Sequence, residues 1–172
     1  SDTSIHVLNW DGDRNTEPNT GGLMEDLIVF NGKDAGPTRA LLYSGAEITS
    51  QITGTGMARP VLTLTSDGNE TAGAPVMTLR VVGDANGDGL EDIVITNPLD
   101  ASSSQNVEPY IGRAFLSLGR ADGTTNLGLT NDADAILEDV SLGAGVFALG
   151  DLNRDGYDDF GVSRTREDLN AA

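Results

Sequence analysis

The fold is decided by the stretch Val82-Gly83-Asp84-Ala85-Asn86-Gly87-Asp88-Gly89-Leu90-Glu91-Asp92-Ile93-Val94-Ile95, which recurs as Leu149-Gly150-Asp151-Leu152-Asn153-Arg154-Asp155-Gly156-Tyr157-Asp158-Asp159-Phe160-Gly161-Val162. Each copy consists of an apolar run, the pattern Asp-x-Asn-x-Asp-Gly-x-x-Asp, and a second apolar run. Short apolar runs bounded by Gly, Asn and Asp are typical of β-strands that are joined by a turn. The sequence therefore predicts two copies of a hairpin with a polar loop.

The polar residues of each loop are those that a hard cation requires. Ca²⁺ takes about six to eight oxygen ligands from carboxylates, amide and backbone carbonyls, and water. Glycine at the sixth position permits the sharp turn that brings alternate side chains together, and several carboxylates this close would repel one another without a cation. The candidate ligands are Asp84, Asn86, Asp88, Asp92 and the carbonyl of Leu90 in one copy, and Asp151, Asn153, Asp155, Asp159 and the carbonyl of Tyr157 in the other.

Two known calcium loops differ from this pattern. An EF-hand needs a bidentate Glu at its twelfth position, where this chain has Ile95 and Val162. The fourth carboxylate comes instead at the ninth position and is followed directly by strand-like residues. Dockerin copies lie closer together and continue into helices. In the pairs Glu91–Asp92 and Asp158–Asp159, the second member is the expected ligand and the first is expected to face solvent.

The loop between two β runs resembles the FG-GAP repeat of integrin α-chain β-propellers and of many bacterial secreted proteins. The resemblance implies that the loop joins the first and second strands of a blade and binds Ca²⁺ through the residues named above. The Phe-Gly and Gly-Ala-Pro signatures of the family are poorly kept, with the closest traces at 145–150 and 96–98. The resemblance therefore supports the metal loop and does not extend to integrin-like partner binding.

A third, diverged copy is expected near the start of the chain. An apolar run at 5–10 precedes Asp11-Gly12-Asp13-Arg14-Asn15, and the tail of 21–30 closely matches 89–95. Asp11 to Asp26 spans 15 positions, against eight from Asp84 to Asp92, which implies a seven-residue insertion around 16–22. The alternative is an acidic, glycine-rich loop without a metal. The candidate ligands of this copy are Asp11, Asp13, Asn15 and Asp26.

The remaining apolar runs complete a repeated order of strands. Arg-Ala followed by an apolar run recurs at 39–43 and 113–118, at the same place after each loop, and is similar to the third-strand signal of FG-GAP blades. Further strands are expected at 61–65, 76–82, 92–96, 135–140, 145–150 and 159–163, with a short helix as the alternative at 135–140. The chain is thus divided into three repeat units at 1–75, 76–143 and 144–172.

The intervals between loops are those of propeller blades with insertions. They are 73 residues from Asp11 to Asp84 and 67 from Asp84 to Asp151. We therefore predict an all-β fold with β-propeller-like blades of four antiparallel strands, of which this chain holds about 2.5, whereas a closed propeller needs roughly four to eight. An open stack exposes a strand edge, so the expected partners are other copies of the chain or the remainder of a longer propeller.

Composition excludes several classes of function. The net charge is −17 and the pI about 4.1, which makes nucleic acid an unfavourable partner. The sequence has no run of 18 apolar residues, so membrane insertion is not expected. Cysteine is absent, so the sequence offers neither disulfides nor thiolate metal sites. The single histidine, His6, leaves no Ser-His-Asp arrangement, and no phosphate loop is present. We therefore expect no enzyme activity, no catalytic residues and no cofactor other than Ca²⁺.

The expected function is cell-surface adhesion, or building an extracellular assembly, through protein or glycan contacts. Extracellular Ca²⁺ modules bind with dissociation constants of about 10⁻⁴–10⁻³ M, which suits calcium levels outside the cell. Two alternatives remain open from the sequence. The chain could be a non-catalytic module or fragment of a secreted enzyme, or a lectin-like module that binds glycans.

Overall fold

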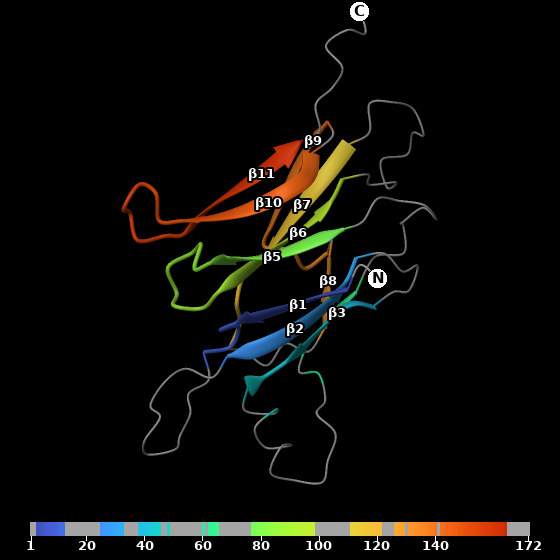
Figure 1. The fold of residues 1–172 in the computed structure, drawn as a ribbon, viewed down its shortest axis with the longest axis vertical. Helices are drawn as coiled ribbons and strands as arrows, with labels where there is room; N and C mark the ends of the chain where they lie inside the picture. The colour runs from blue at the N-terminus through green and yellow to red at the C-terminus, as the bar shows by residue number, and fades with distance from the viewer. Residues whose placement is uncertain are drawn as a thin grey trace, which may run out of the picture.

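The protein is all-β and contains several antiparallel sheets. The computed structural model describes residues 3–12, 25–32, 38–45, 48, 60, 62–65, 77–98, 111–121, 126–129, 131–140 and 142–164. The strands of this part of the chain form three sheets that lie one above another (Figure 1). None of these residues belongs to a helix long and apolar enough to cross a bilayer.

The first sheet is an antiparallel meander with one added strand. Its order is β1-β2-β3-β4-β8, and each of the first four strands pairs with the next along the chain. The fifth, β8, pairs with β4 in the parallel direction. The strands are β1 (Thr3–Leu8), β2 (Asp26–Asn31), β3 (Thr38–Tyr43), β4 (Leu62–Thr65) and β8 (Asn126–Gly128).

The second sheet repeats the same meander, and the third contains its first two strands. The order of the second sheet is β5-β6-β7-β9, and that of the third is β10-β11. The strand predicted at 135–140 is confirmed, and the helix alternative there is wrong. The strands are β5 (Thr78–Gly83), β6 (Asp92–Asn97), β7 (Ile111–Ser117), β9 (Ala135–Val140), β10 (Leu142–Gly150) and β11 (Asp159–Arg164).

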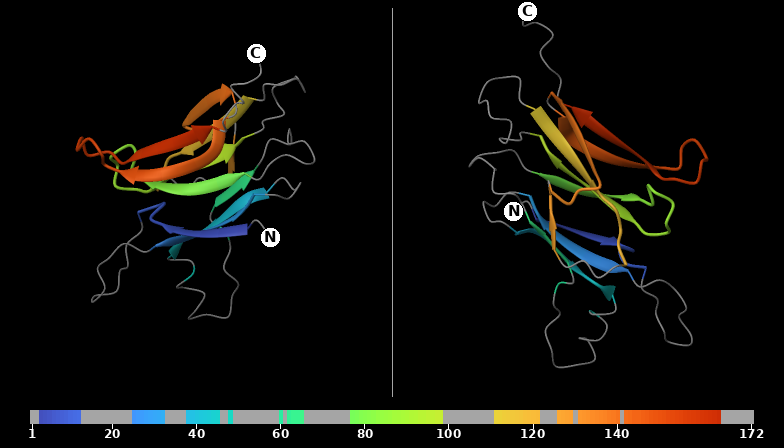
Figure 2. Two further views of the ribbon diagram at one scale, coloured as in Figure 1. Left: turned by 45° about the horizontal axis from the view of Figure 1, so that its top comes forward. Right: turned by 180° about the vertical axis from the view of Figure 1, so that it is seen from behind.

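Apolar side chains fill the spaces between neighbouring sheets. One core joins the first and second sheets and includes Ile28, Phe30, Leu79 and Ile95, all at most 2% exposed. A smaller core between the second and third sheets contains Val82, Val94, Ala114 and Val146. Each fully buried Leu, Ile or Phe side chain contributes about 1.5–3 kcal/mol, so face-to-face packing holds the three layers together (Figure 2).

A segment of the second repeat unit crosses to the first sheet. Between β7 and β9 the chain places β8 beside β4, and Leu127 and Leu129 are buried in the core between the first and second sheets. The backbone N–H of Arg120 donates to the carbonyl of Trp10 at 2.8 Å, and that of Leu129 donates to Thr65 at 3.0 Å. The sequence did not predict β8, which lies in the range of the second unit but belongs to the first sheet.

Candidate metal loops

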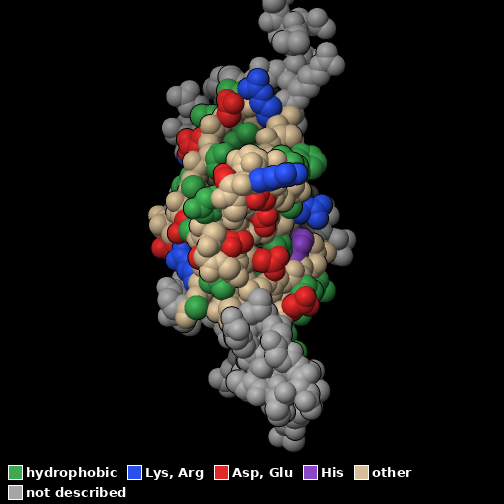
Figure 3. Space-filling view, turned by 90° about the vertical axis from the view of Figure 1, so that its left-hand side faces the viewer, with side chains coloured by type: hydrophobic (Ala, Val, Ile, Leu, Met, Phe, Trp, Pro, Cys, Tyr) green, Lys and Arg blue, Asp and Glu red, His purple; other side chains and the backbone are tan. Residues whose placement is uncertain are grey.

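The two intact loops are the hairpin connections that the sequence predicted. Residues 84–92 join β5 to β6, and residues 151–159 join β10 to β11. Both project from the same side of the molecule, on the left in Figure 1. Figure 3 views this side and shows acidic side chains gathered on it.

The side chains of the first intact loop turn inward onto its own backbone. Asp84 Oδ1 accepts the N–H groups of Gly87 at 2.6 Å and Asp88 at 3.0 Å, and Asp84 Oδ2 accepts that of Gly89 at 2.7 Å. Asn86 Oδ1 accepts the N–H of Asp88 at 3.0 Å, and Asp88 Oδ1 accepts that of Leu90 at 2.8 Å. These bonds hold the side chains of Asp84, Asn86 and Asp88 against the backbone of the loop.

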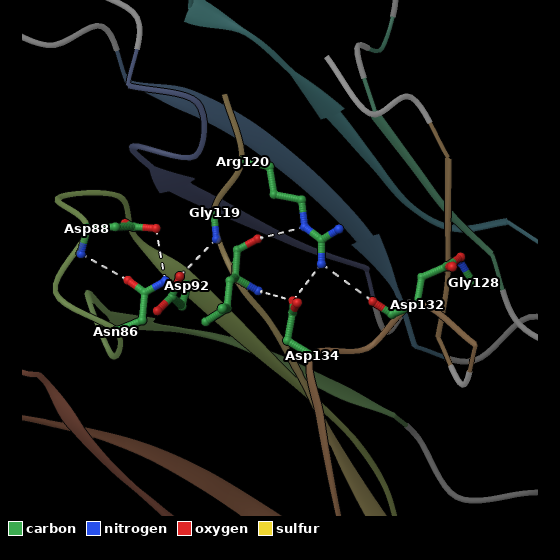
Figure 4. Close-up of polar contacts among 9 residues, drawn as sticks. Asn86, Asp88, Asp92, Gly119, Arg120, Gly128, Asp132 and Asp134 are labelled. Atoms are coloured by element: carbon green, nitrogen blue, oxygen red, sulfur yellow. Dashed lines mark hydrogen bonds and ion pairs between the residues drawn. The ribbon is translucent and has the colours of Figure 1, made fainter. Parts of the chain in front are cut away.

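The second intact loop repeats four of these five hydrogen bonds. Asp151 accepts the N–H groups of Asp155 at 3.1 Å and Gly156 at 3.0 Å. Asn153 accepts the N–H of Asp155 at 2.9 Å, and Asp155 accepts that of Tyr157 at 3.0 Å. In both loops the amide of the third residue donates to the carboxylate of the fifth at 2.9 Å (Figure 4 shows Asn86 and Asp88).

The backbone turns are also the same. Positive φ occurs at Gly83 and Gly150, just before each loop, and at the sixth position, with 87° for Gly89 and 93° for Gly156. At the fourth position one loop has glycine, with φ 78°, and the other has Arg154, with φ 63°. A non-glycine residue in this region is uncommon. The repeat therefore imposes this conformation even where the side chain disfavours it.

The last aspartate of each loop ties the loop to its surroundings. Asp92 is 0% exposed, and its two carboxylate oxygens accept the N–H groups of Ala85 and Gly119, both at 2.8 Å. Ala85 belongs to the loop, whereas Gly119 follows β7 (Figure 4). Asp159 Oδ2 accepts the N–H of Leu152 at 3.0 Å in the same way as Asp92 accepts Ala85.

Burial makes the Asp92 carboxyl a weaker acid. Its pKa is raised from the usual 3.8 to about 6, chiefly by loss of solvent and to a smaller extent by the carboxylates of Asp88 and Asp84. The N–H groups of Gly119 and Ala85 lower the pKa and oppose this effect only in part. A divalent cation beside the carboxyl would stabilise its charged form.

The diverged first loop begins two residues earlier than the sequence suggested. Gly12 donates its N–H to Asn9 Oδ1 at 3.1 Å and has φ 69°, so these two residues correspond to Gly87 and Asp84. Asn9 therefore occupies the first position and Asp11 the third. The sequence pattern did not include Asn9 because it requires Asp at this position, although the glycine three residues later was a usable signal. Asp13 and Asn15 lie outside the described residues.

Asp26 closes the diverged loop as Asp92 closes the intact one. Its Oδ2 accepts the N–H groups of Trp10 at 2.8 Å and Asp11 at 3.3 Å, and its Oδ1 accepts that of Gly45 at 2.8 Å. Gly45 follows β3 as Gly119 follows β7. The corrected span is 17 positions from Asn9 to Asp26, against eight from Asp84 to Asp92, so the insertion is nine residues rather than seven.

The first loop is hydrogen-bonded to the second, and the second to the third. The N–H of Asn9 donates to Glu91 Oε2 at 2.6 Å, and the N–H of Glu91 donates to the Asn9 carbonyl at 2.7 Å. The N–H of Asp84 donates to Asp158 Oδ2 at 3.0 Å, and the N–H of Asp158 donates to the Asp84 carbonyl at 2.9 Å. The prediction that Glu91 and Asp158 face solvent is therefore wrong, because both bind the preceding unit.

The candidate metal ligands of these loops are all oxygen atoms, which suits a hard cation such as Ca²⁺. Among the described residues, no three acidic or histidine side chains come together at metal-binding distance.

His6 lies on β1, where its ring forms a hydrogen bond with the Ser4 hydroxyl at 2.9 Å. Burial lowers the pKa of His6, and the charge of Arg80 lowers it to a smaller extent. No protein-family model matches the sequence, and no curated protein matches it.

Proposed function

We propose that the chain is a calcium-stabilised repeat protein of the FG-GAP type, whose three sheets are successive blades of a β-propeller. The observation that supports this most is the equivalence of loops 84–92 and 151–159 in side-chain hydrogen bonds and in backbone turns. Each loop lies between the first and second strands of an antiparallel sheet, which is the position that the family resemblance implies.

The proposed role of the ion is structural. The oxygens of Asp84, Asn86, Asp88 and Asp92 and the Leu90 carbonyl would hold one Ca²⁺, and their equivalents in 151–159 would hold a second. An ion between these groups offsets the repulsion of the carboxylates and the cost of burying Asp92, so metal binding and folding are coupled. Asn9, Asp11, Asp13 and Asp26 would form a weaker site, because an amide replaces the first carboxylate.

The proposed setting is outside the cell or at its surface, in adhesion or in an extracellular assembly, without a catalytic role. Binding constants of about 10⁻⁴–10⁻³ M are typical of extracellular calcium modules and match the calcium available there. The stacked sheets provide a scaffold with loops on one side, and the chain carries a strongly negative charge of −17, which divalent ions reduce.

Native mass spectrometry with calcium titration tests this proposal by counting the ions directly. At millimolar calcium we expect two specifically bound ions, and one fewer in Asp155→Asn, because that change removes a carboxylate from one loop only. The matched control is Asp139→Asn, which alters an exposed acid on β9 outside the loops. Equal calcium loss in both variants, or no specific calcium in the unchanged protein, would contradict the proposal.

A further inference from the structure

The loops of successive repeat units meet at two equivalent junctions. At each one, the residue before the last aspartate of a loop exchanges two hydrogen bonds with the first residue of the preceding loop. Glu91 does this with Asn9, and Asp158 does it with Asp84. Both acids are half-buried. Each carboxylate accepts a backbone N–H and each acid returns its own N–H to a carbonyl, and we call this reciprocal pair of hydrogen bonds the clamp.

Side-chain packing repeats at the same two junctions. Tyr157, at the seventh position of its loop, lies over Gly87, where an added Cβ would be 2.7 Å from Tyr157 Cε1. Leu90, at the seventh position of the preceding loop, lies against Gly12, where an added Cβ would be 2.8 Å from Leu90 Cδ2. Both glycines occupy the fourth position of their loops. Two different kinds of contact thus join each loop to the next.

The clamp between the two intact loops involves their candidate calcium ligands. Asp84 is the first ligand of its loop, and its own backbone N–H and carbonyl are the groups that bind Asp158. On either side of Asp158 are Tyr157, whose carbonyl is a candidate ligand, and Asp159, the last ligand of its loop. One pair of hydrogen bonds therefore holds ligands of both loops, and each loop keeps its geometry best while its neighbour is ordered.

We infer that Asp158 is a positioning residue that couples calcium binding in loops 84–92 and 151–159, so that an ion in either loop raises the affinity of the other. An ion binds the ordered form of its own loop and so favours that form. The clamp is complete only when both loops are ordered, so the second ion meets a loop that the first has already helped to order. This coupling rests on the calcium role proposed above and describes how the two sites regulate each other.

The sign of the coupling separates the clamp from electrostatics. Two bound cations repel each other, so charge alone would make the second ion bind more weakly. A structural link acts in the opposite direction. Coupling between binding sites is also reciprocal, and it typically amounts to about 5- to 150-fold in affinity. We therefore expect tighter binding of the second ion, by the same factor whichever loop is filled first.

Nuclear magnetic resonance of the whole chain follows each loop separately during a calcium titration. The amide signals of Gly89 and Gly156 report on the two intact loops, because each N–H donates to the first aspartate of its own loop. Asp155→Asn disables the second intact loop, and the calcium midpoint at Gly89 should then rise about fivefold or more. Asp88→Asn disables the first intact loop and should raise the midpoint at Gly156 by the same factor.

Gly83→Ala breaks the clamp without changing any charge. A Cβ at Gly83 would lie within 3 Å of the Asp158 carboxylate, which must then leave its hydrogen-bonded position. Gly150→Ala is the matched control, because Gly150 precedes the other loop and also has positive φ, but an added Cβ meets nothing within 4 Å. With the second intact loop disabled, the Gly89 midpoint should shift by less than about twofold in Gly83→Ala and by about fivefold or more in Gly150→Ala.

Asp158→Ala removes the acceptor without a backbone penalty and should abolish the shift as Gly83→Ala does. Unshifted midpoints in the single-loop variants, or a shift toward tighter binding, would overturn the coupling. A shift that survives Asp158→Ala, or one that is lost equally in Gly83→Ala and Gly150→Ala, would also overturn it. Calcium responses at both Gly89 and Gly156 with independent midpoints refute only the coupling, whereas no response at either glycine refutes the calcium sites as well.

Discussion

Substitution of Asp92 by Asn separates the contribution of the ion from that of the fold. The carboxylate is fully buried, and its pKa of about 6 instead of 3.8 corresponds to a cost of about 3 kcal/mol for keeping it ionised near pH 7. Asn removes that cost but accepts only one of the two backbone N–H groups, and losing the other charge-assisted bond costs about 1.5–3 kcal/mol. Without calcium, the two effects nearly cancel.

Calcium changes this balance, because only the unchanged loop retains all of its carboxylates. With a dissociation constant of about 10⁻⁴–10⁻³ M, about 10 mM calcium stabilises one loop by about 1.4–2.7 kcal/mol. The assay is urea unfolding followed by circular dichroism, for both proteins, in calcium and in chelator. We expect similar stability in chelator and a calcium-dependent gain that is smaller in Asp92→Asn by about this amount.

Asp159→Asn is the matched control, because Asp159 takes the same loop position with a partly exposed side chain, and among the described strands β11 pairs only with β10. This variant should lose a similar calcium-dependent gain without the offsetting relief of a fully buried charge. If Asp92→Asn keeps the full calcium-dependent gain, the carboxylate is no ligand. If it loses several kcal/mol in chelator, the hydrogen bonds outweigh the burial cost and our estimate is wrong.

Three further predictions concern pH, the clamp and a glycine. Because the folded-state pKa of Asp92 is raised, the calcium-free protein should lose stability as pH rises from about 4 to about 6, which urea unfolding at several pH values checks. Calcium affinity should fall as pH drops below about 6, which calorimetric titration checks. Glu91→Gln should destabilise by about 1–2 kcal/mol in urea, because the amide is a weaker acceptor for the Asn9 N–H. Glu25→Gln, at an exposed residue just before β2, should not. Gly83→Ala should lower thermal stability more than Gly89→Ala does. Both glycines have φ 87°, but only at Gly83 would a Cβ lie within 3 Å of the Asp158 carboxylate. Equal losses would argue against that contact.

The strands and hairpin loops could be predicted because their signals are local. Apolar runs flanked by Asp, Asn and Gly locate β5, β6, β10 and β11 to within a few residues. The first strand ends at Leu8 rather than residue 10, because Asn9 already belongs to the loop. A pattern that allows only Asp at the first position places that loop two residues too late.

What the sequence did not predict depends on contacts between distant segments. Glu91 looks like a surface acid within its own loop, and only the position of Asn9 in the neighbouring unit gives it a partner. β8 has three residues, too few to show any periodicity, and its strand character comes from pairing with β4. A closed propeller, a bound ion and a partner likewise depend on more than a local stretch of sequence, so they stay predictions.

The crossing of β8 to the first sheet has a consequence for synthesis on the ribosome. Thr63 pairs with Asn126, so the outer strand of the first sheet is translated 63 residues after the strand that it covers. Until then, the nascent first unit exposes the free side of β4 and lacks Leu127 and Leu129 from its core. An uncovered strand edge in a half-made chain favours misassembly, so the first sheet can finish folding only when most of the second has left the exit tunnel.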